Sequence, residues 1–204
     1  MAGPGRKERW EEVYSTKAEV SWYQEDPRLS QELIRKFAPP GRGRILDVGG
    51  GASRLVDALL GLDFERVAVL DIAEAALERS RRRLGARASE VEWIVADVTT
   101  VGDVGGFDLW HDRAVFHFLT DAEDREAYVD LARRTLPVGG HLIVATFADD
   151  GPTRCSRLDV RRYDAESMAA ALGDGFRLIE QARERHETPW GASQSFFYGV
   201  FRRV

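Results

Sequence analysis

The chain has 204 residues, which fits one domain with a hydrophobic core of its own. Hydrophobic residues make up 44% and charged residues 31%, a composition typical of globular proteins and not of disordered or membrane-spanning chains. The formal net charge is −5, so overall charge favours neither nucleic acid nor an anionic membrane as a partner.

Short strand-like runs alternate with longer amphipathic stretches along the chain. This alternation predicts βαβ units built around a mostly parallel sheet. The predicted elements, in chain order, are helices at 7–14 and 27–37, a strand at 44–48, a helix from 52 to about 60, a strand at 66–70, a helix from about 73 to 84, strands at 91–96 and 107–111, a helix from 122 to about 136, a strand at 141–147, a helix at 165–172, and strands at 176–185 and 193–202.

Turn and cap residues set several of these boundaries. The second helix has proline in its first turn and is stopped by the Pro-Pro-Gly segment at 39–41. Asp121 is expected to cap the helix that follows it. Pro189 and Gly191 lie between the last two strands, which are therefore expected to pair antiparallel.

A glycine-rich turn follows the first predicted strand, in the segment ILDVGGGAS at 45–53. It leads from a strand into a helix, the setting in which such turns bind ligands. Glycine lets the backbone turn sharply and approach a ligand where a Cβ would clash. Taken alone, the motif could also mark a tight turn in any α/β protein.

Three acidic residues end successive predicted strands: Asp47, Asp71 and Asp97. Asp71 lies 24 residues after Asp47, an offset at which a carboxylate can accept hydrogen bonds from both ribose hydroxyls. Ligands of open α/β sheets bind at the carboxyl ends of the strands. One such acid could merely cap the next helix, but three of them beside the glycine turn indicate a ligand site at this edge.

With these residues, the chain resembles the class I S-adenosylmethionine-dependent methyltransferases over nearly its whole length. The resemblance implies a Rossmann-like three-layer α/β sandwich. Its seven-stranded, mostly parallel sheet would have the order 3-2-1-4-5-7-6 with an antiparallel last strand. The cofactor would be S-adenosylmethionine, with S-adenosylhomocysteine as product. A single methyltransferase domain would cover 1–204, with 1–40 as an N-terminal helical cover segment.

The resemblance also implies roles for single residues. The turn from Asp47 to Gly51 would hold the methionine part of the cofactor, and Asp71 would bind the ribose hydroxyls. Ile72 and Val98 would pack on the two faces of the adenine, whose amino group would donate to Asp97. The expected cofactor-binding residues are Asp47, Gly49, Gly50, Gly51, Asp71, Ile72, Asp97, Val98, Asp112, Tyr14 and Trp22.

The N-terminal segment is rich in aromatic residues, at 10–14 and 20–23. It resembles the cover of a branch that includes thiopurine methyltransferase and small lysine methyltransferases, where the segment folds over the cofactor. Tyr14 and Trp22 are the candidates for such contacts here. Ordinary core packing is the alternative, and an aromatic residue can do both.

The segment DLWHDRAVFHF at 108–118 is expected near the transferred methyl group. Lysine-directed relatives often have Asp-Lys-Gly where this chain has Asp112-Arg113-Ala114, so a small molecule is the favoured acceptor and a protein side chain the alternative. A base is needed only if the acceptor arrives protonated, and histidine titrates near neutrality. The catalytic candidates are therefore His117, Asp112 and His111. They do not complete a metal ligand set, so no metal is expected.

Other readings of the same pattern remain open. A nicotinamide-dependent oxidoreductase shares the architecture, but Ser53 stands where its third glycine would be, and Asp97 and the reversed strands would be unexplained. A non-catalytic adenosyl-binding protein would keep the cofactor-binding residues. The lone cysteine Cys155, the polar start at 1–9 and the lack of an apolar run near roughly 20 residues predict a cytoplasmic protein without a membrane or nucleic-acid partner.

Overall fold

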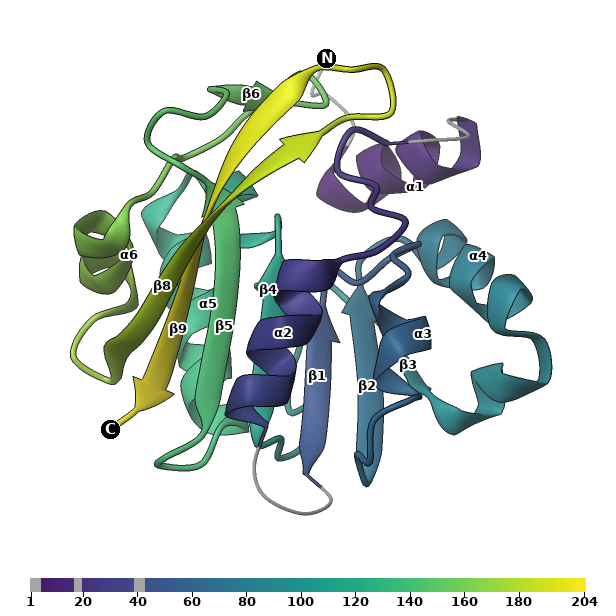
Figure 1. The fold of residues 1–204 in the computed structure, drawn as a ribbon, viewed down its shortest axis with the longest axis horizontal. Coiled ribbons are helices and arrows are strands. Elements are labelled where there is room, and N and C mark those ends of the chain that lie inside the picture. The colour runs from purple at the N-terminus through teal and green to yellow at the C-terminus, as the bar shows by residue number, and fades with distance from the viewer. Residues whose placement is uncertain (1–4, 17–19, 39–42) are drawn as a thin grey trace.

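The computed structural model describes residues 5–16, 20–38 and 43–204. Seven strands form one sheet in the order β3-β2-β1-β4-β5-β9-β8, and helices cover both of its faces (Figure 1). The helices are α1 (Arg6–Thr16), α2 (Arg28–Phe37), α3 (Leu55–Leu59), α4 (Glu74–Leu84), α5 (Ala122–Thr135) and α6 (Ala165–Leu172), with 3₁₀ turns η1 (Gly85–Glu90) and η2 (Phe116–Phe118). The strands are β1 (Arg44–Val48), β2 (Arg66–Asp71), β3 (Glu92–Val95), β4 (Leu109–Arg113), β5 (His141–Phe147), β6 (Arg154–Cys155), β7 (Leu158–Asp159), β8 (Phe176–Glu187) and β9 (Ser193–Arg203).

The sheet confirms the expected fold class. Strands β1 to β5 pair in parallel, whereas β9 pairs antiparallel with both β5 and β8. The order 3-2-1-4-5-7-6 is therefore right once only the strands of this sheet are counted. The labels differ because the short β6–β7 hairpin, which is not part of the sheet, lies in the connector after β5.

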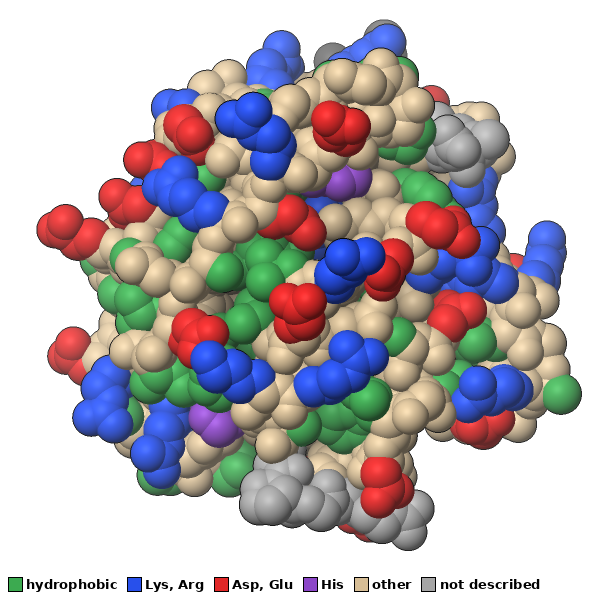
Figure 2. All heavy atoms as spheres, in the orientation of Figure 1, with side chains coloured by type: hydrophobic (Ala, Val, Ile, Leu, Met, Phe, Trp, Pro, Cys, Tyr) green, Lys and Arg blue, Asp and Glu red, His purple; other side chains and the backbone are tan. Residues whose placement is uncertain are grey.

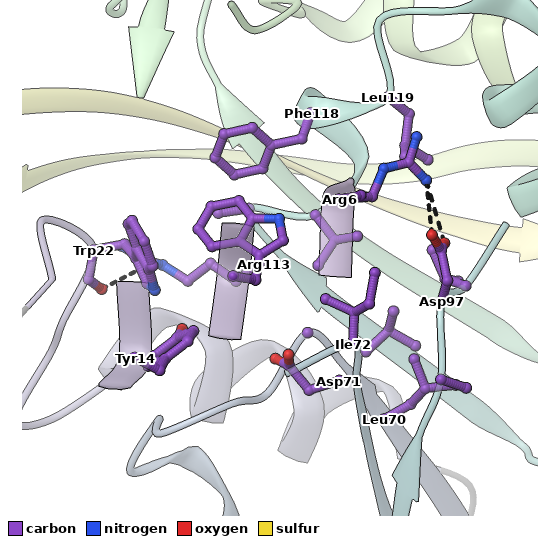
Figure 3. A pocket seen from close by; sticks show the side chains of 17 residues that line it. Arg6, Tyr14, Trp22, Leu70, Asp71, Ile72, Asp97, Arg113, Phe118 and Leu119 are labelled. Atoms are coloured by element: carbon purple, nitrogen blue, oxygen red, sulfur yellow. Dashed lines mark hydrogen bonds and ion pairs between the residues drawn. The ribbon is translucent and has the colours of Figure 1, made fainter. Parts of the chain in front are cut away.

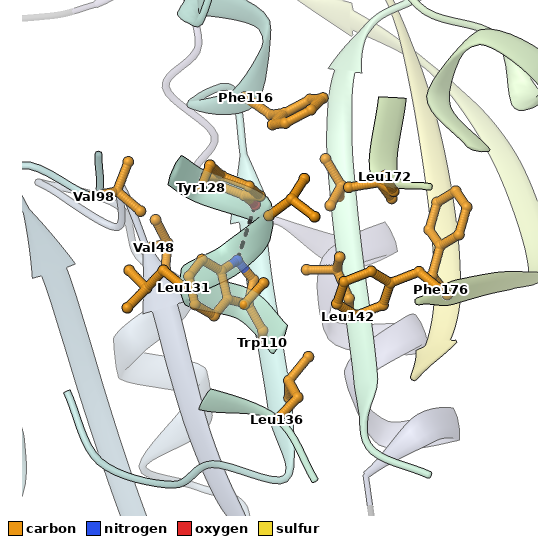
Figure 4. Close-up of a cluster of buried hydrophobic side chains, with 14 of the residues drawn as sticks. Val48, Val98, Trp110, Phe116, Tyr128, Leu131, Leu136, Leu142, Leu172 and Phe176 are labelled. Atoms are coloured by element: carbon orange, nitrogen blue, oxygen red, sulfur yellow. Dashed lines mark hydrogen bonds between the residues drawn. The ribbon is translucent and has the colours of Figure 1, made fainter. Parts of the chain in front are cut away.

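The central strands are buried on both faces, which favours apolar residues in them. In β5, every residue after His141 is buried. Side chains of α2, α3 and α4 pack on one face of the sheet, and those of α5 and α6 pack on the other. On the α5 side, Trp110 lies fully buried in β4 and donates from Nε1 to the Tyr128 hydroxyl at 2.9 Å (Figure 4).

Two predicted boundaries are wrong for local reasons. The helix expected from residue 52 begins only at Leu55, because the turn before it contains positive-φ glycines and Ser53 Oγ accepts the Leu55 amide at 3.1 Å. The strand expected at 107–111 is β4, Leu109–Arg113. It starts later because the Phe107 amide donates to the Thr135 carbonyl, outside the sheet.

The expected cap residues are partly right. Asp121 does occupy the position before α5, but its side chain makes no capping hydrogen bond. A capping box that the sequence analysis missed lies before α6, where Asp164 and Ser167 satisfy each other's backbone amides. Helix α2 ends at Phe37 as expected, while the Pro-Pro-Gly segment at 39–41 lies outside the described residues.

Candidate functional site

The turn after β1 has a backbone that only glycine adopts without strain. Gly49 and Gly51 have φ of +70° and +48°. A Cβ at Gly49 would come within 2.0 Å of Val115 Cγ2. A Cβ at Gly51 would lie 3.0 Å from both the Asp71 carboxylate and the Tyr14 hydroxyl. The turn therefore brings its glycine backbone close to Tyr14 of α1, Asp71 at the end of β2 and Val115 after β4.

The three strand-end acids lie along this edge of the sheet. Asp71 ends β2, where its Oδ1 accepts the Ala73 amide at 2.8 Å. Asp97 follows β3 and accepts from the backbone amide and hydroxyl of Thr99 at 2.9 and 2.7 Å. Burial raises the pKa of Asp71 to about 7, and the nearby carboxylates of Asp47 and Glu11 add to the shift. Asp71 is therefore about half protonated near neutral pH.

A cavity of about 630 Å³ opens over these acids, beneath α1 (Figure 3). The lining is mostly apolar with a few ionisable groups, consisting of Arg6, Trp10, Tyr14, Trp22, Val48, Gly49, Leu70, Asp71, Ile72, Ala96, Asp97, Val98, Arg113, Ala114, Val115, Phe118 and Leu119.

Aromatic rings form one wall of this cavity. Tyr14 lies 6.3 Å from Trp22, and Trp22 lies 5.6 Å from Trp10, measured between ring centroids. Trp10 in turn lies 4.9 Å from Phe118. All three pairs meet edge to face. These rings therefore connect α1 and the segment after it to η2.

Polar contacts attach α1 to the rim. The Arg6 guanidinium bridges Asp97, at 3.1 Å, and Asp124 at the start of α5. The Glu11 carboxylate accepts the backbone amides of residues 74 and 75, at 2.7 and 3.1 Å. Helix α4 has no side-chain cap of its own, so Glu11 supplies one from α1. Arg79 of α4 donates in return to the Tyr14 carbonyl.

A second cavity, of about 530 Å³, continues beneath the glycine turn and shares Tyr14, Trp22, Gly49 and Arg113 with the first. At its base His111 Nδ1 lies 2.7 Å from Asp47 Oδ1, and His111 Nε2 lies 2.9 Å from Ser30 Oγ. All three side chains are buried. Asp47 Oδ2 is buried as well and has no hydrogen-bond partner among the described residues.

Asp112 and His117, two of the catalytic candidates, lie in the interior and line neither cavity. Asp112 accepts from the backbone amides of Val115 and Phe116 and from the Tyr128 hydroxyl, and burial raises its pKa to about 6. His117 Nδ1 accepts the Phe147 amide at 3.2 Å. Burial, with a smaller effect from Arg113, lowers the pKa of His117 to about 3, so this imidazole is neutral at physiological pH.

Arg113 is a site residue that the sequence analysis did not select. It ends β4, lines both cavities, and is only 9% exposed at its side chain. Its guanidinium donates to the Tyr198 hydroxyl and the Trp22 carbonyl, both at 2.9 Å, and to Glu184 at 3.3 Å. The signal available in the sequence was a charged residue just after a predicted strand, at the edge where the strand-end acids lie. Arg6, Trp10, Phe118 and Leu119 were also not selected.

Two features are absent from the described part of the chain. No group of three or more His, Cys, Asp or Glu side chains there is arranged to hold a metal ion. Among the same residues, no helix has the length and apolar character needed to cross a membrane.

Comparison with known proteins gives concordant matches. Residues 45–140 match the sequence profile of a methyltransferase domain. Nodulation protein S of Rhizobium tropici is 32% identical over 160 residues, which are 78% of this chain and 63% of that protein. Nodulation protein S of Sinorhizobium fredii is 30% identical over 78% of this chain and 70% of its own length. The chain thus spans less than two thirds of the first relative and slightly more than two thirds of the second.

A solved structure shares the fold over almost the full chain. It is the N-methyltransferase NodS from Bradyrhizobium japonicum in complex with S-adenosyl-l-homocysteine. The two chains superpose with a TM-score of 0.74 at 20% identity, and the match covers 98% of this chain and 99% of the other.

Proposed function

The chain belongs to the class I S-adenosylmethionine-dependent methyltransferases, and we propose that it transfers a methyl group to a nucleophilic atom of a small molecule bound beneath α1. The observation that carries this proposal is the cavity of about 630 Å³ at the sheet edge, which α1 covers and the glycine turn and strand-end acids border. A protein acceptor is the alternative, and it would need an open groove instead of a covered cavity.

The residues along this edge fit S-adenosylmethionine. The bare backbone at Gly49 and Gly51 leaves room where a Cβ would clash, and the unpartnered Oδ2 of Asp47 offers an acceptor. We assign the ribose hydroxyls to Asp71, and the adenine to a slot between Ile72 and Val98 beside Asp97. The proposed cofactor-binding set is Asp47, Gly49, Gly50, Gly51, Asp71, Ile72, Asp97, Val98, Tyr14 and Trp22.

The protein's own part in the reaction is to position and enclose. A bound S-adenosylmethionine supplies an activated methyl group, so the site must mainly align the acceptor and exclude water. The ionisable side chains that line the larger cavity are Arg6, Tyr14, Asp71, Asp97 and Arg113. Burial raises the pKa of Tyr14 above its ordinary value, so this hydroxyl is a poor base. We therefore propose that the acceptor enters with its nucleophilic lone pair already free.

We revise the roles of the catalytic candidates accordingly. Asp112 would hold the Val115 and Phe116 amides, and thereby shape the segment that borders the cofactor. His117 would fill the core behind Phe118 in its neutral form. His111 would act through Asp47, as argued below.

Domain organisation and compartment complete the proposal. We propose one methyltransferase domain over 1–204 with 1–40 as its cover, supported by α1 and α2 packing beside the same site. We also propose a cytoplasmic protein, supported by its lone cysteine. Acidic and basic side chains are interspersed on the face seen in Figure 2, which does not favour a nucleic-acid partner.

Calorimetry and methyl labelling test the proposed function. The protein should bind S-adenosylhomocysteine and show no comparable binding of NADH or NADPH. Radiolabelled S-adenosylmethionine, incubated with the protein and a cell extract, should then yield labelled small molecules other than S-adenosylmethionine in the filtrate of a size-exclusion filter. Label retained with protein would support the protein acceptor, and cofactor binding without any transfer would support a non-catalytic adenosyl-binding protein.

The pKa of Asp71 predicts a pH dependence of cofactor binding. In the empty site its carboxyl group is protonated below about pH 7, whereas the ionised form is the better acceptor for two ribose hydroxyls. The affinity for S-adenosylhomocysteine should therefore rise with pH up to about 7, by at most about tenfold per pH unit, and then level off. The stability of the ligand-free protein should change with pH in the opposite direction. Because the pKa is raised on folding, the stability contribution of Asp71 is present at low pH and is lost as pH rises through about 7.

Titration calorimetry between pH 5.5 and 8.5 measures this effect. Repeating it in buffers of different ionisation enthalpy counts the proton that binding releases. Asp71→Asn serves as the matched variant, since its side chain keeps an acceptor oxygen but cannot ionise. A pH profile as steep in Asp71→Asn as in the natural protein would rule out Asp71 as its cause.

A further inference from the structure

The buried carboxylate of Asp47 is only half satisfied. Its Oδ1 is paired with His111, while its Oδ2 lies beneath the glycine turn, so close that a Cβ at Gly50 would be 2.4 Å away. This oxygen has no partner among the described residues, although Asp47 is only 2% exposed. A buried carboxylate oxygen without a donor is costly, so it indicates a ligand group that donates to it.

Ser30 and His111 fix the orientation of this carboxylate. His111 lies on β4 directly opposite Asp47 of β1, and Ser30 lies on α2 above them. His111 Nδ1 lies 2.7 Å from Asp47 Oδ1, so the tautomer with its proton on Nδ1 donates to this oxygen. The Ser30 hydroxyl holds the other ring nitrogen at 2.9 Å. The three residues therefore leave Oδ2, and not Oδ1, without a protein partner beneath the glycine turn, in a residue that lines the smaller cavity.

Among the described residues that line the smaller cavity there is one arginine or lysine, and its guanidinium already has hydrogen-bond partners. Arg113 lines this space, but its guanidinium donates to Tyr198, Trp22 and Glu184. Among the described residues, the ion-pair partner of Asp47 is His111, and its Oδ2 has no hydrogen-bond partner. A positively charged donor from the ligand would balance the charge of Asp47.

We propose that Ser30 and His111 are positioning residues that hold Asp47 Oδ2 ready for the α-ammonium group of the cofactor's amino-acid part. This inference rests on the proposed function, because it presumes that the ligand is S-adenosylmethionine. Its consequence is selectivity within the adenosyl ligands. The relay from Ser30 through His111 to Asp47 serves the amino-acid part and leaves the adenosine part, at Asp71 and Asp97, untouched.

Two ligands separate these parts in a binding experiment. S-adenosylhomocysteine carries the ammonium group, and 5′-methylthioadenosine has the same adenosine without the amino acid. His111→Gln places its amide near the Nε2 position, so it can reach Ser30 but not Asp47. We expect this variant to bind S-adenosylhomocysteine about tenfold or more weakly, and 5′-methylthioadenosine as tightly as the natural protein does.

His111→Asn is the rescue variant, because its amide lies near the Nδ1 position and can donate to Asp47. It should recover most of the affinity for S-adenosylhomocysteine. Ser30→Ala keeps the imidazole but frees its far side, so it should cause a smaller loss for that ligand alone. Ser30→Ala also tests the proposal if His111→Gln does not fold. His141→Ala is the control, since His141 begins β5 at the opposite end of the sheet.

The outcomes distinguish the inference from the proposed function. Equal losses for both ligands, or no loss for S-adenosylhomocysteine in His111→Gln and Ser30→Ala, would overturn the relay while leaving the methyltransferase assignment intact. Failure of the natural protein to bind either ligand would instead overturn the proposed function.

Discussion

Replacing Asp71 with alanine is expected to lower the affinity for S-adenosylhomocysteine by about 10- to 150-fold. The variant loses the proposed acceptor for the ribose hydroxyls, and hydrogen bonds to a charged group contribute roughly 1.5–3 kcal/mol. The change in stability should be small because two effects oppose each other. The Ala73 amide loses its carboxylate acceptor, but the burial that raises the pKa of Asp71 to about 7 no longer acts on a charge.

Titration calorimetry at pH 8 measures the affinity where Asp71 is ionised, and thermal unfolding checks that the variant is folded. Asp103→Ala is the matched control, because Asp103 is an exposed acid that accepts only the nearby Gly105 amide. A folded Asp71→Ala variant that keeps the natural affinity would remove Asp71 from the site.

The features that the sequence predicted well are local in the chain. The glycine turn, Asp71 and Asp97 each lie within a few residues of a strand end, and strand ends of a parallel sheet share one edge. The terminal strands were also predictable, since a turn that contains Pro189 and Gly191 joins two strand-like runs. For such features, the distance in sequence from a strand end is enough to predict where the residue lies in the fold.

The features that were missed depend on contacts between distant segments. Ser30 meets His111 across 81 positions, and Arg6 meets Asp97 across 91. The pattern of β4 gave a further clue that was not used. Successive residues of a strand face opposite sides, so His111 and Asp112 could not both face the cofactor. His111 faces Asp47 and Ser30, whereas Asp112 faces Tyr128 of α5.

Removing the first 23 residues is expected to reduce turnover on the order of 100-fold and to weaken cofactor binding, while the sheet and its helices stay folded. The truncation deletes α1 and the segment after it. Four residues that line the larger cavity are lost with them: Arg6, Trp10, Tyr14 and Trp22. The reacting groups would then be open to water and the acceptor would lose one wall.

The packing explains why the remaining core should survive. The buried residues of α1 and the segment after it belong to a small separate cluster of Val13, Tyr14, Val20, Ala73 and Ala76. The two large clusters on either side of the sheet do not include α1 among their buried members. On α4 the truncation uncovers mainly alanine side chains, and these expose little apolar surface to water.

Hydrogen exchange distinguishes a moving lid from a fixed plug. Besides its aromatic and apolar contacts, α1 is attached at its rim by polar contacts, where Arg6 reaches Asp97 and Asp124 and Glu11 caps α4. Such contacts can break and re-form without disturbing the sheet core. We therefore expect the empty protein to exchange measurably across residues 10–16 and 20–22, and S-adenosylhomocysteine to slow exchange there and at 47–53. Glu11→Gln weakens the cap on α4 and keeps every residue that lines the cavity, so it should speed exchange in the empty protein and lose less turnover than the truncation. If α1 is fully protected without ligand and unchanged by it, or if the truncated chain does not fold, α1 is a structural plug and the lid is disproved.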